Sequence, residues 1–138
     1  MRIDELLNRA LPWEWVTDSK AIFDSPNGTP YHTYCQRFSG NSYLFGFDTM
    51  DSFDGAFTHE GQAFAILSTA IEILQDFVAN HPNVKSIIFA AKSNEPSRVA
   101  VYRRLVQRFS YRLGFAYTEE EKEMVGYDVV LFTINLDA

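Results

Sequence analysis

The segment that decides the fold of this chain is Val84-Lys85-Ser86-Ile87-Ile88-Phe89-Ala90-Ala91. It is almost continuously apolar, which is typical of a central strand buried on both faces of a sheet. Helix-like patterns flank it, from Gly61 to Asn80 on one side and from Pro96 to Leu113 on the other. This order predicts a buried strand at 84–91 between helices at about 61–80 and 96–113. We expect Leu74 and Ile88 to lie in the core.

The sequence before residue 61 predicts a short helix followed by strands. Residues 3–11 have helical spacing and stop at Pro12, so we expect an N-terminal helix within 1–12. Trp13-Glu14-Trp15-Val16 fits either a short strand or an aromatic plug. Strands are predicted at 20–25, 31–39 and 42–49, and the Asn27-Gly28 pair between the first two is a strong hairpin signal.

The sequence after residue 113 predicts two more strands, at 115–118 and 127–135, separated by an acidic turn at 119–123. The whole order is an antiparallel meander that leads into a βα unit. It predicts an α/β fold, a mixed sheet with helices on both faces. We expect one domain over 1–138, with its core at 20–135.

Composition limits the classes of function. The chain has 138 residues, 46% of them hydrophobic, and a net charge of −6, which disfavours direct binding of DNA or RNA. The single cysteine, Cys35, excludes an internal disulfide and a cysteine-based zinc site. No apolar run resembles a signal peptide or a membrane span. We therefore expect a soluble, cytoplasmic protein with no metal and no membrane partner.

Three short features are candidates for chemistry. Gly61-Gln62-Ala63 opens the first long helix, where free backbone N–H groups can hold a phosphate, although Gly61 can equally serve close packing. Tyr102 can donate a proton as a general acid or can simply fill the core. His59 can act as a base or lie in an exposed loop.

The second long helix is basic and contains no acidic residue. Arg104, Arg108 and Arg112 form one stripe at a spacing of four residues. Arg98 lies near the helix N-terminus, where a cation is unfavourable unless an anion is close. These arginines are candidates for binding a partner, and an acidic side chain of the same protein is the alternative.

The order of elements resembles the GNAT superfamily of acyl-CoA N-acyltransferases over roughly residues 20 to 135. In that family a Gln/Arg-x-x-Gly-x-Gly/Ala loop holds the pyrophosphate of coenzyme A. The matching segment, Thr58-His59-Glu60-Gly61-Gln62-Ala63, keeps Gly61 and Ala63, but it has Thr58 in the first position and an acidic Glu60 beside the phosphate. A later family helix carries a tyrosine closely followed by Gly-Phe. Here Tyr102 and Gly114-Phe115 are about two helical turns further apart, as in divergent GNAT-like proteins encoded by bacteriophages.

Two functions follow as expectations. In the first, the GNAT-like scaffold is a binding or inhibitory protein that acts on a host or viral protein and needs no cofactor. Its support is the missing Gln/Arg, the intruding Glu60 and the lengthened helix. In the second, the resemblance implies an acetyl-CoA-dependent N-acetyltransferase, with Gly61–Ala63 at the pyrophosphate and Tyr102 as general acid. The sequence favours the first by a small margin and leaves the oligomeric state open.

Overall fold

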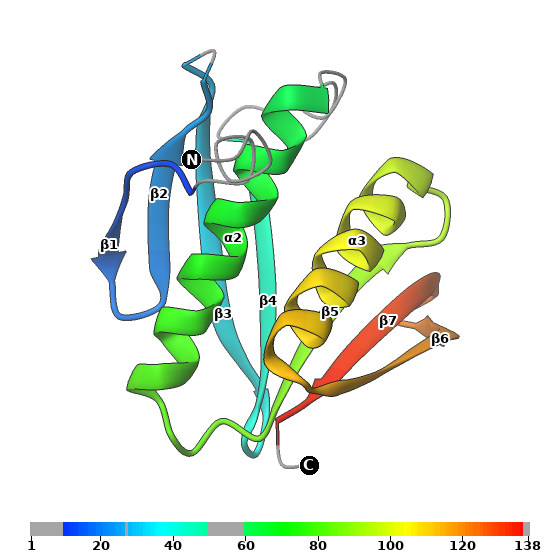
Figure 1. Ribbon diagram of the computed structural model, residues 1–138. Coiled ribbons are helices and arrows are strands. Elements are labelled where there is room, and N and C mark those ends of the chain that lie inside the picture. The colour runs from blue at the N-terminus through cyan, green and yellow to red at the C-terminus, as the bar shows by residue number, and fades with distance from the viewer. Residues whose placement is uncertain (1–9, 27, 50–59, 137–138) are drawn as a thin grey trace. The chain divides into compact units, whose positions relative to one another are not determined.

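The computed structural model describes residues 10–26, 28–49 and 60–136 (Figure 1). The N-terminal helix expected at 3–11 lies almost wholly outside these residues, and so does the loop with His59. The described elements, in chain order, are β1 (Trp13–Thr17), β2 (Lys20–Asp24), β3 (Pro30–Ser39), β4 (Ser42–Thr49), α2 (Glu60–Asn80), β5 (Ser86–Lys92), α3 (Pro96–Leu113), β6 (Ala116–Met124) and β7 (Tyr127–Asn135).

The strands form one mixed sheet in the order β1-β2-β3-β4-β5-β7-β6. β5 pairs in parallel with β4 and antiparallel with β7, so the predicted central strand is confirmed. The α/β fold class and both long helices are confirmed as well. Neither α2 nor α3 combines the length and the hydropathy that a membrane-crossing helix needs.

The chain forms two compact units, which we call unit 1 (residues 1–35 and 47–80) and unit 2 (residues 36–46 and 81–138). Each unit takes two separate stretches of the sequence. In the part of the chain that the structure describes, each unit has one long helix, α2 in unit 1 and α3 in unit 2. The expected single domain over 1–138, and the expected helices on both faces of the sheet, therefore stay predictions.

In unit 1, two tryptophans of β1 form hydrogen bonds with α2. The Trp13 indole Nε1 donates to Glu72 Oε1 at 2.9 Å, and the Trp15 indole Nε1 donates to Asp76 Oδ2 at 2.7 Å. Trp13–Val16 is thus part of a paired strand, which decides between the two alternatives that the sequence left open. The core beneath contains Leu74, fully buried as expected.

In unit 2, α3 packs against the β5–β7–β6 part of the sheet. Its Leu105, Val106 and Phe109 are fully buried, and Gly114 ends it in the left-handed conformation, with φ of 76°. On β5, Ile87 is fully buried, whereas Ile88, on the opposite face, is only half-buried. The expectation that Ile88 lies in the core was therefore wrong by one residue, because its neighbour Ile87 is the one that faces the core.

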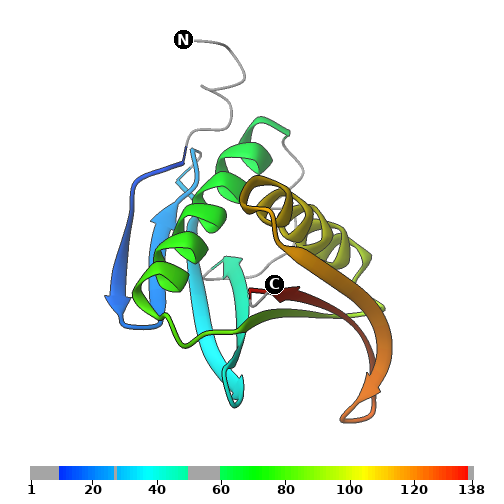
Figure 2. The same cartoon turned by 60° about the horizontal axis from the view of Figure 1, so that its bottom comes forward.

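The predicted acidic turn at 119–123 is wrong, because these residues belong to β6. Figure 2 shows the resulting long hairpin of β6 (orange) and β7 (dark red). The chain reverses at Val125-Gly126, where both φ angles are positive (51° and 81°), as a two-residue hairpin turn requires. β6 is an edge strand with most side chains exposed, so it tolerates a run of glutamates that a central strand would not.

Candidate functional site

The sheet opens within unit 2, between β4 and β5. The parallel pairing joins residues 42–44 to residues 86–88 and, among the described residues, ends at Leu44 and Ile88. Beyond that point β5 continues to Lys92 with β7 on its other side. The rings of Phe45 and Phe89, the next residues along each strand, have centroids 5.3 Å apart. One edge of β5 therefore lacks a partner strand, over its last residues, within 10–26, 28–49 and 60–136.

Tyr102 lies against this part of β5. Its ring centroid is 5.5 Å from that of Phe89, and only 1% of the residue is exposed. Tyr102 thus belongs to the core of unit 2, and its ring partner Phe89 lies one residue beyond the end of the parallel pairing. Tyr102 is therefore a core residue next to the place where β4 and β5 separate. Its role as a general acid stays a prediction.

A cavity of about 380 Å³ lies at the carboxyl end of β5. It is lined by Lys92, Ser93 and Asn94 after the strand, and by Gly126, Tyr127 and Asp128 at the start of β7. The Lys92 Nζ lies 4.2 Å from the centre of the Tyr127 ring, which holds the ammonium over an aromatic face. Neither segment has a local sequence signal for this cavity, because the pairing of β5 with β7 is what brings 126–128 beside 92–94.

The proposed phosphate segment falls at the start of α2. The helix begins at Glu60, so Gly61, Gln62 and Ala63 form its first turn, as the sequence predicted. The first N–H groups of a helix have no partner within the helix. Positive partial charge therefore gathers there, as an anion-binding segment requires. His59 lies outside the described residues.

The arginines of α3 differ in their burial and in their partners. Arg98 forms an ion pair with Glu95 at 3.2 Å, so an acidic side chain of the same protein is one of its partners. Arg104 and Arg112 are exposed, whereas Arg108 is partly buried. Burial lowers the pKa of Arg108, and the neighbouring Arg112 and Arg104 lower it further. Partner binding by this set stays a prediction.

Arg103 makes the best-defined ion pair of α3. Its Nε and Nη2 donate to the two carboxylate oxygens of Glu119 on β6 at 2.9 and 2.7 Å. This hydrogen bond raises the pKa of Arg103 and lowers the pKa of Glu119. Part of the basic charge of α3 is thus matched by the acidic run of β6. No group of three potential metal ligands occurs in the described part of the chain.

No protein-family model and no curated protein matches the sequence. Solved structures do match. An acetyltransferase of the GNAT family from Bacillus anthracis is 12% identical, with a TM-score of 0.54 over 87% of this chain and 68% of that one. The diaminobutyrate acetyltransferase from Paenibacillus lautus, in complex with L-2,4-diaminobutyric acid and coenzyme A, is 18% identical, with a TM-score of 0.54 over 86% of this chain and 70% of that one.

A spermidine N-acetyltransferase chimera from Vibrio cholerae and hSSAT is 12% identical, with a TM-score of 0.52 over 85% of this chain. This chain spans only 64% of that protein. At such identities the likeness concerns the fold alone. This chain has the fold of the GNAT acetyltransferases.

Proposed function

We propose that this protein is an acyl-CoA-dependent N-acyltransferase. The observation that carries the proposal is the separation of β4 from β5 within unit 2, in a fold that it shares with N-acetyltransferases. The sequence alone favoured a binding scaffold. The structural neighbours support the enzyme better, because those described above are acetyltransferases.

The free edge of β5 suits an extended ligand that carries amides. Beyond Ile88 the backbone groups on the β4 side have no strand partner among the described residues. An extended chain with amide groups can add to such an edge as an extra strand would. The pantetheine arm of coenzyme A is a chain of this kind, so the residues from Phe89 to Lys92 are the ones that would hold it.

Tyr102 is the residue that we assign to proton transfer. Acetyl-CoA would supply the acyl group as a thioester, whose sulfur leaves as a thiolate when an amine attacks. A phenol held within hydrogen-bond reach of that sulfur can protonate it, and the proton that the amine nitrogen loses on acylation restores the phenol. Tyr102 lies beside Phe89, at the start of the free edge. Its burial would keep water away from the proton that it holds.

We propose that the acceptor amine binds in the cavity at the carboxyl end of β5. Ligands of open α/β sheets commonly bind outside the carboxyl ends of strands. Asp128 supplies a carboxylate for an ammonium group, and Asn94 supplies an amide that can both donate and accept. Lys92 is held over the Tyr127 ring, which keeps its charge at one side of the cavity.

The test is a calorimetric titration with acetyl-CoA, followed by an assay of free thiol release with a panel of primary amines. We expect saturable binding and amine-dependent thiol release. Tyr102→Phe should lower turnover and leave acetyl-CoA affinity unchanged, since only the proton donor is lost. Tyr111→Phe is the matched control, because Tyr111 lies on the same helix with 92% of its surface exposed. Absence of binding would reject the enzyme.

A binding scaffold is the second candidate. The observation in its favour is the 1% exposure of Tyr102, together with the exposed Arg104 and Arg112 on α3. On this reading the protein needs no coenzyme and recognises an acidic protein surface. The acetyl-CoA titration separates the two candidates, because a scaffold gives no saturable heat.

A further inference from the structure

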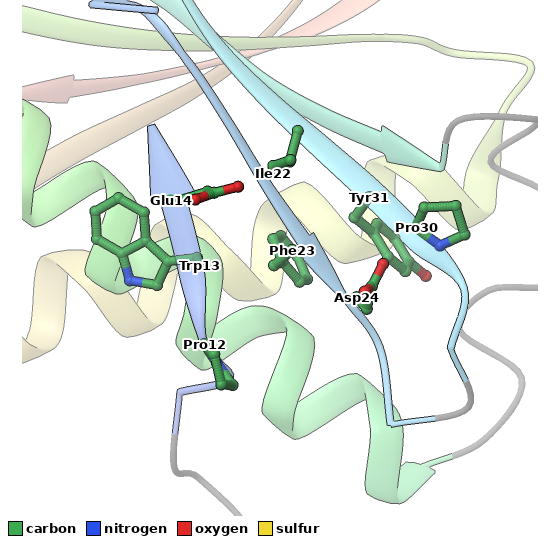
Figure 3. A pocket seen from close by; sticks show the side chains of 8 residues that line it. All are labelled: Pro12, Trp13, Glu14, Ile22, Phe23, Asp24, Pro30 and Tyr31. Atoms are coloured by element: carbon green, nitrogen blue, oxygen red, sulfur yellow. The ribbon is translucent and has the colours of Figure 1, made fainter. Parts of the chain in front are cut away.

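The alternation of side chains along each strand decides which residues can share a binding face. In unit 1 a cavity of about 320 Å³ is lined by the residues labelled in Figure 3. Among them Phe23 pairs with Trp13 and with Tyr31. Glu14 pairs with Ile22, one position along, so these two side chains lie on the opposite face of the sheet. The aromatic rings and the carboxylate therefore do not share a face there.

In unit 2 the same alternation gathers an apolar patch on the face of the sheet that turns away from α3. Phe89 contacts Tyr102 of α3, so the residues on either side of Phe89 along β5 lie on the other face. Leu131 on β7 is at the centre of the patch and is 7% exposed, while the residues around it are half-buried. The apolar patch consists of Ile88, Ala90, Val129, Leu131 and Thr133. In the described part of unit 2 no helix lies over it, because α3 packs on the other face.

Two lysines flank one end of the apolar patch. Lys92 on β5 and Lys122 on β6 both pair with Val129 of β7, so the three side chains form one row on one face. Neighbouring strands are about 4.8 Å apart, so the backbones of the two lysines are about 10 Å apart and both ammonium groups can reach one anion over Val129. The Nζ of Lys92 lies 4.2 Å from the centre of the Tyr127 ring, which keeps it at this end of the patch.

The carboxylates nearby do not cancel this charge. Neither Lys92 nor Lys122 forms an ion pair within the described residues. Asp128 pairs with Glu123, and both belong to the face of Glu119, which contacts α3. Along β6 the patch face has one carboxylate, that of Glu120. The lysine end of the patch therefore favours an anion.

The apolar patch adjoins the free edge of β5. Ala90 follows Ile88, the last described residue of β5 that pairs with β4, by two positions. It lies on the face opposite Tyr102, the residue that we assign to proton transfer. Lys92 lies two positions further, about 7 Å along the strand. A molecule on the patch can therefore present one end to the free edge and the other end to the lysines.

We propose that the acceptor is a small molecule with an amine at one end of an apolar body and a carboxylate at the other. Lys92 and Lys122 bind the carboxylate. Ala90 and Leu131 contact the apolar body, and the amine lies at the free edge of β5. This inference rests on the proposed N-acyltransferase, whose acceptor it specifies. Charge sets the selectivity, because a second ammonium in place of the carboxylate would meet two lysines.

Three amines that share an alkyl chain test the charge at the far end of the acceptor. 6-Aminohexanoate ends in a carboxylate, hexylamine in a methyl group and 1,6-diaminohexane in a second ammonium. Release of free thiol from acetyl-CoA gives kcat/KM for each amine. We expect 6-aminohexanoate to be preferred over hexylamine about fivefold, as one exposed ion pair can provide, and over 1,6-diaminohexane by more.

Charge changes at the lysines should alter this order. Lys92→Gln should bring the ratio of kcat/KM for 6-aminohexanoate and hexylamine close to one, since it removes one partner of the carboxylate. Lys122→Glu should make 1,6-diaminohexane at least as good an acceptor as 6-aminohexanoate. Lys85→Glu is the matched control, because Lys85 is exposed at the opposite end of β5. It should leave the order of the three amines unchanged.

The outcomes separate this inference from the function on which it rests. Absence of saturable acetyl-CoA binding would reject the N-acyltransferase and this inference with it. Turnover in which hexylamine or 1,6-diaminohexane equals or exceeds 6-aminohexanoate would reject the inference alone. Equal changes in the order of the amines from Lys122→Glu and Lys85→Glu would reject it as well, since the effect would then come from net charge and not from the patch.

Discussion

Truncation of Ile87 should destabilise the protein far more than truncation of its neighbour Ile88. Ile87 is fully buried and shares its face of β5 with Phe89, which contacts Tyr102 of α3. Ile87→Ala removes the side chain beyond Cβ, a transfer loss of about 2.4 kcal/mol at about 0.8 kcal/mol per methylene. The cavity left behind raises the expected loss to about 3–4 kcal/mol.

Ile88→Ala should cost about 1 kcal/mol, because Ile88 is half-buried and its removal leaves no sealed cavity. Urea denaturation followed by circular dichroism measures both losses, and tryptophan fluorescence is a second probe of unfolding, located in unit 1. Ile87→Val is the mild control, with an expected loss of about 1 kcal/mol. Equal losses for the two alanine variants, or a larger one at position 88, would refute the assignment of the faces of β5.

Three further outcomes are expected. Val125→Asn should stabilise the protein by about 0.5–1 kcal/mol in urea denaturation, since asparagine adopts a φ of 51° more easily than a β-branched residue; a loss would mean that the valine side chain makes a contact that stabilises the turn. Trp15→Phe should cost about 1.5–3 kcal/mol, because the indole N–H bonds to the Asp76 carboxylate at 2.7 Å; Asp76→Asn in the same background should then add little. Arg103→Gln should cost only about 0.5 kcal/mol at neutral pH, since the pair with Glu119 is exposed. The hydrogen bond from Arg103 lowers the pKa of Glu119, so the pair stabilises the fold above the unfolded value near pH 4.3. The difference from the unmodified protein should vanish as pH falls through the folded value, and a difference that persists in acid would contradict this account.

Most of the fold could be predicted from local patterns. The continuous apolar run predicts β5, and Pro96 and Gly114 mark the two ends of α3. Both elements were predicted within two residues of their observed ends. The error at β6 has a physical origin, because five charged residues in succession are unusual in a strand unless it lies at an edge. The order of the strands in the sheet decides which strand lies at the edge, and this order could not be predicted from the sequence alone.

The sites were harder to predict than the fold. Tyr102 and the start of α2 follow from local spacing, so both could be named in advance. The cavity beside Lys92 depends on a hairpin that returns more than thirty residues later, and the cavity beside Tyr31 depends on the register of three strands. The Asn27-Gly28 signal predicted that two of these strands pair, but not which side chains would face one another.

The two units have a consequence for the growing chain on the ribosome. Residues 36–46 of unit 2 are synthesised early, and the remaining residues of this unit begin only at residue 81. At about 5–20 residues per second, the hairpin that carries Phe45 waits roughly 2 to 9 s for β5, which ends at Lys92, to be made. During that interval an aromatic side chain that ends 1% exposed has no native cover from β5. Nascent-chain aggregation should therefore concentrate in residues 36–46, and chains stalled after residue 80 should be the form that a chaperone holds.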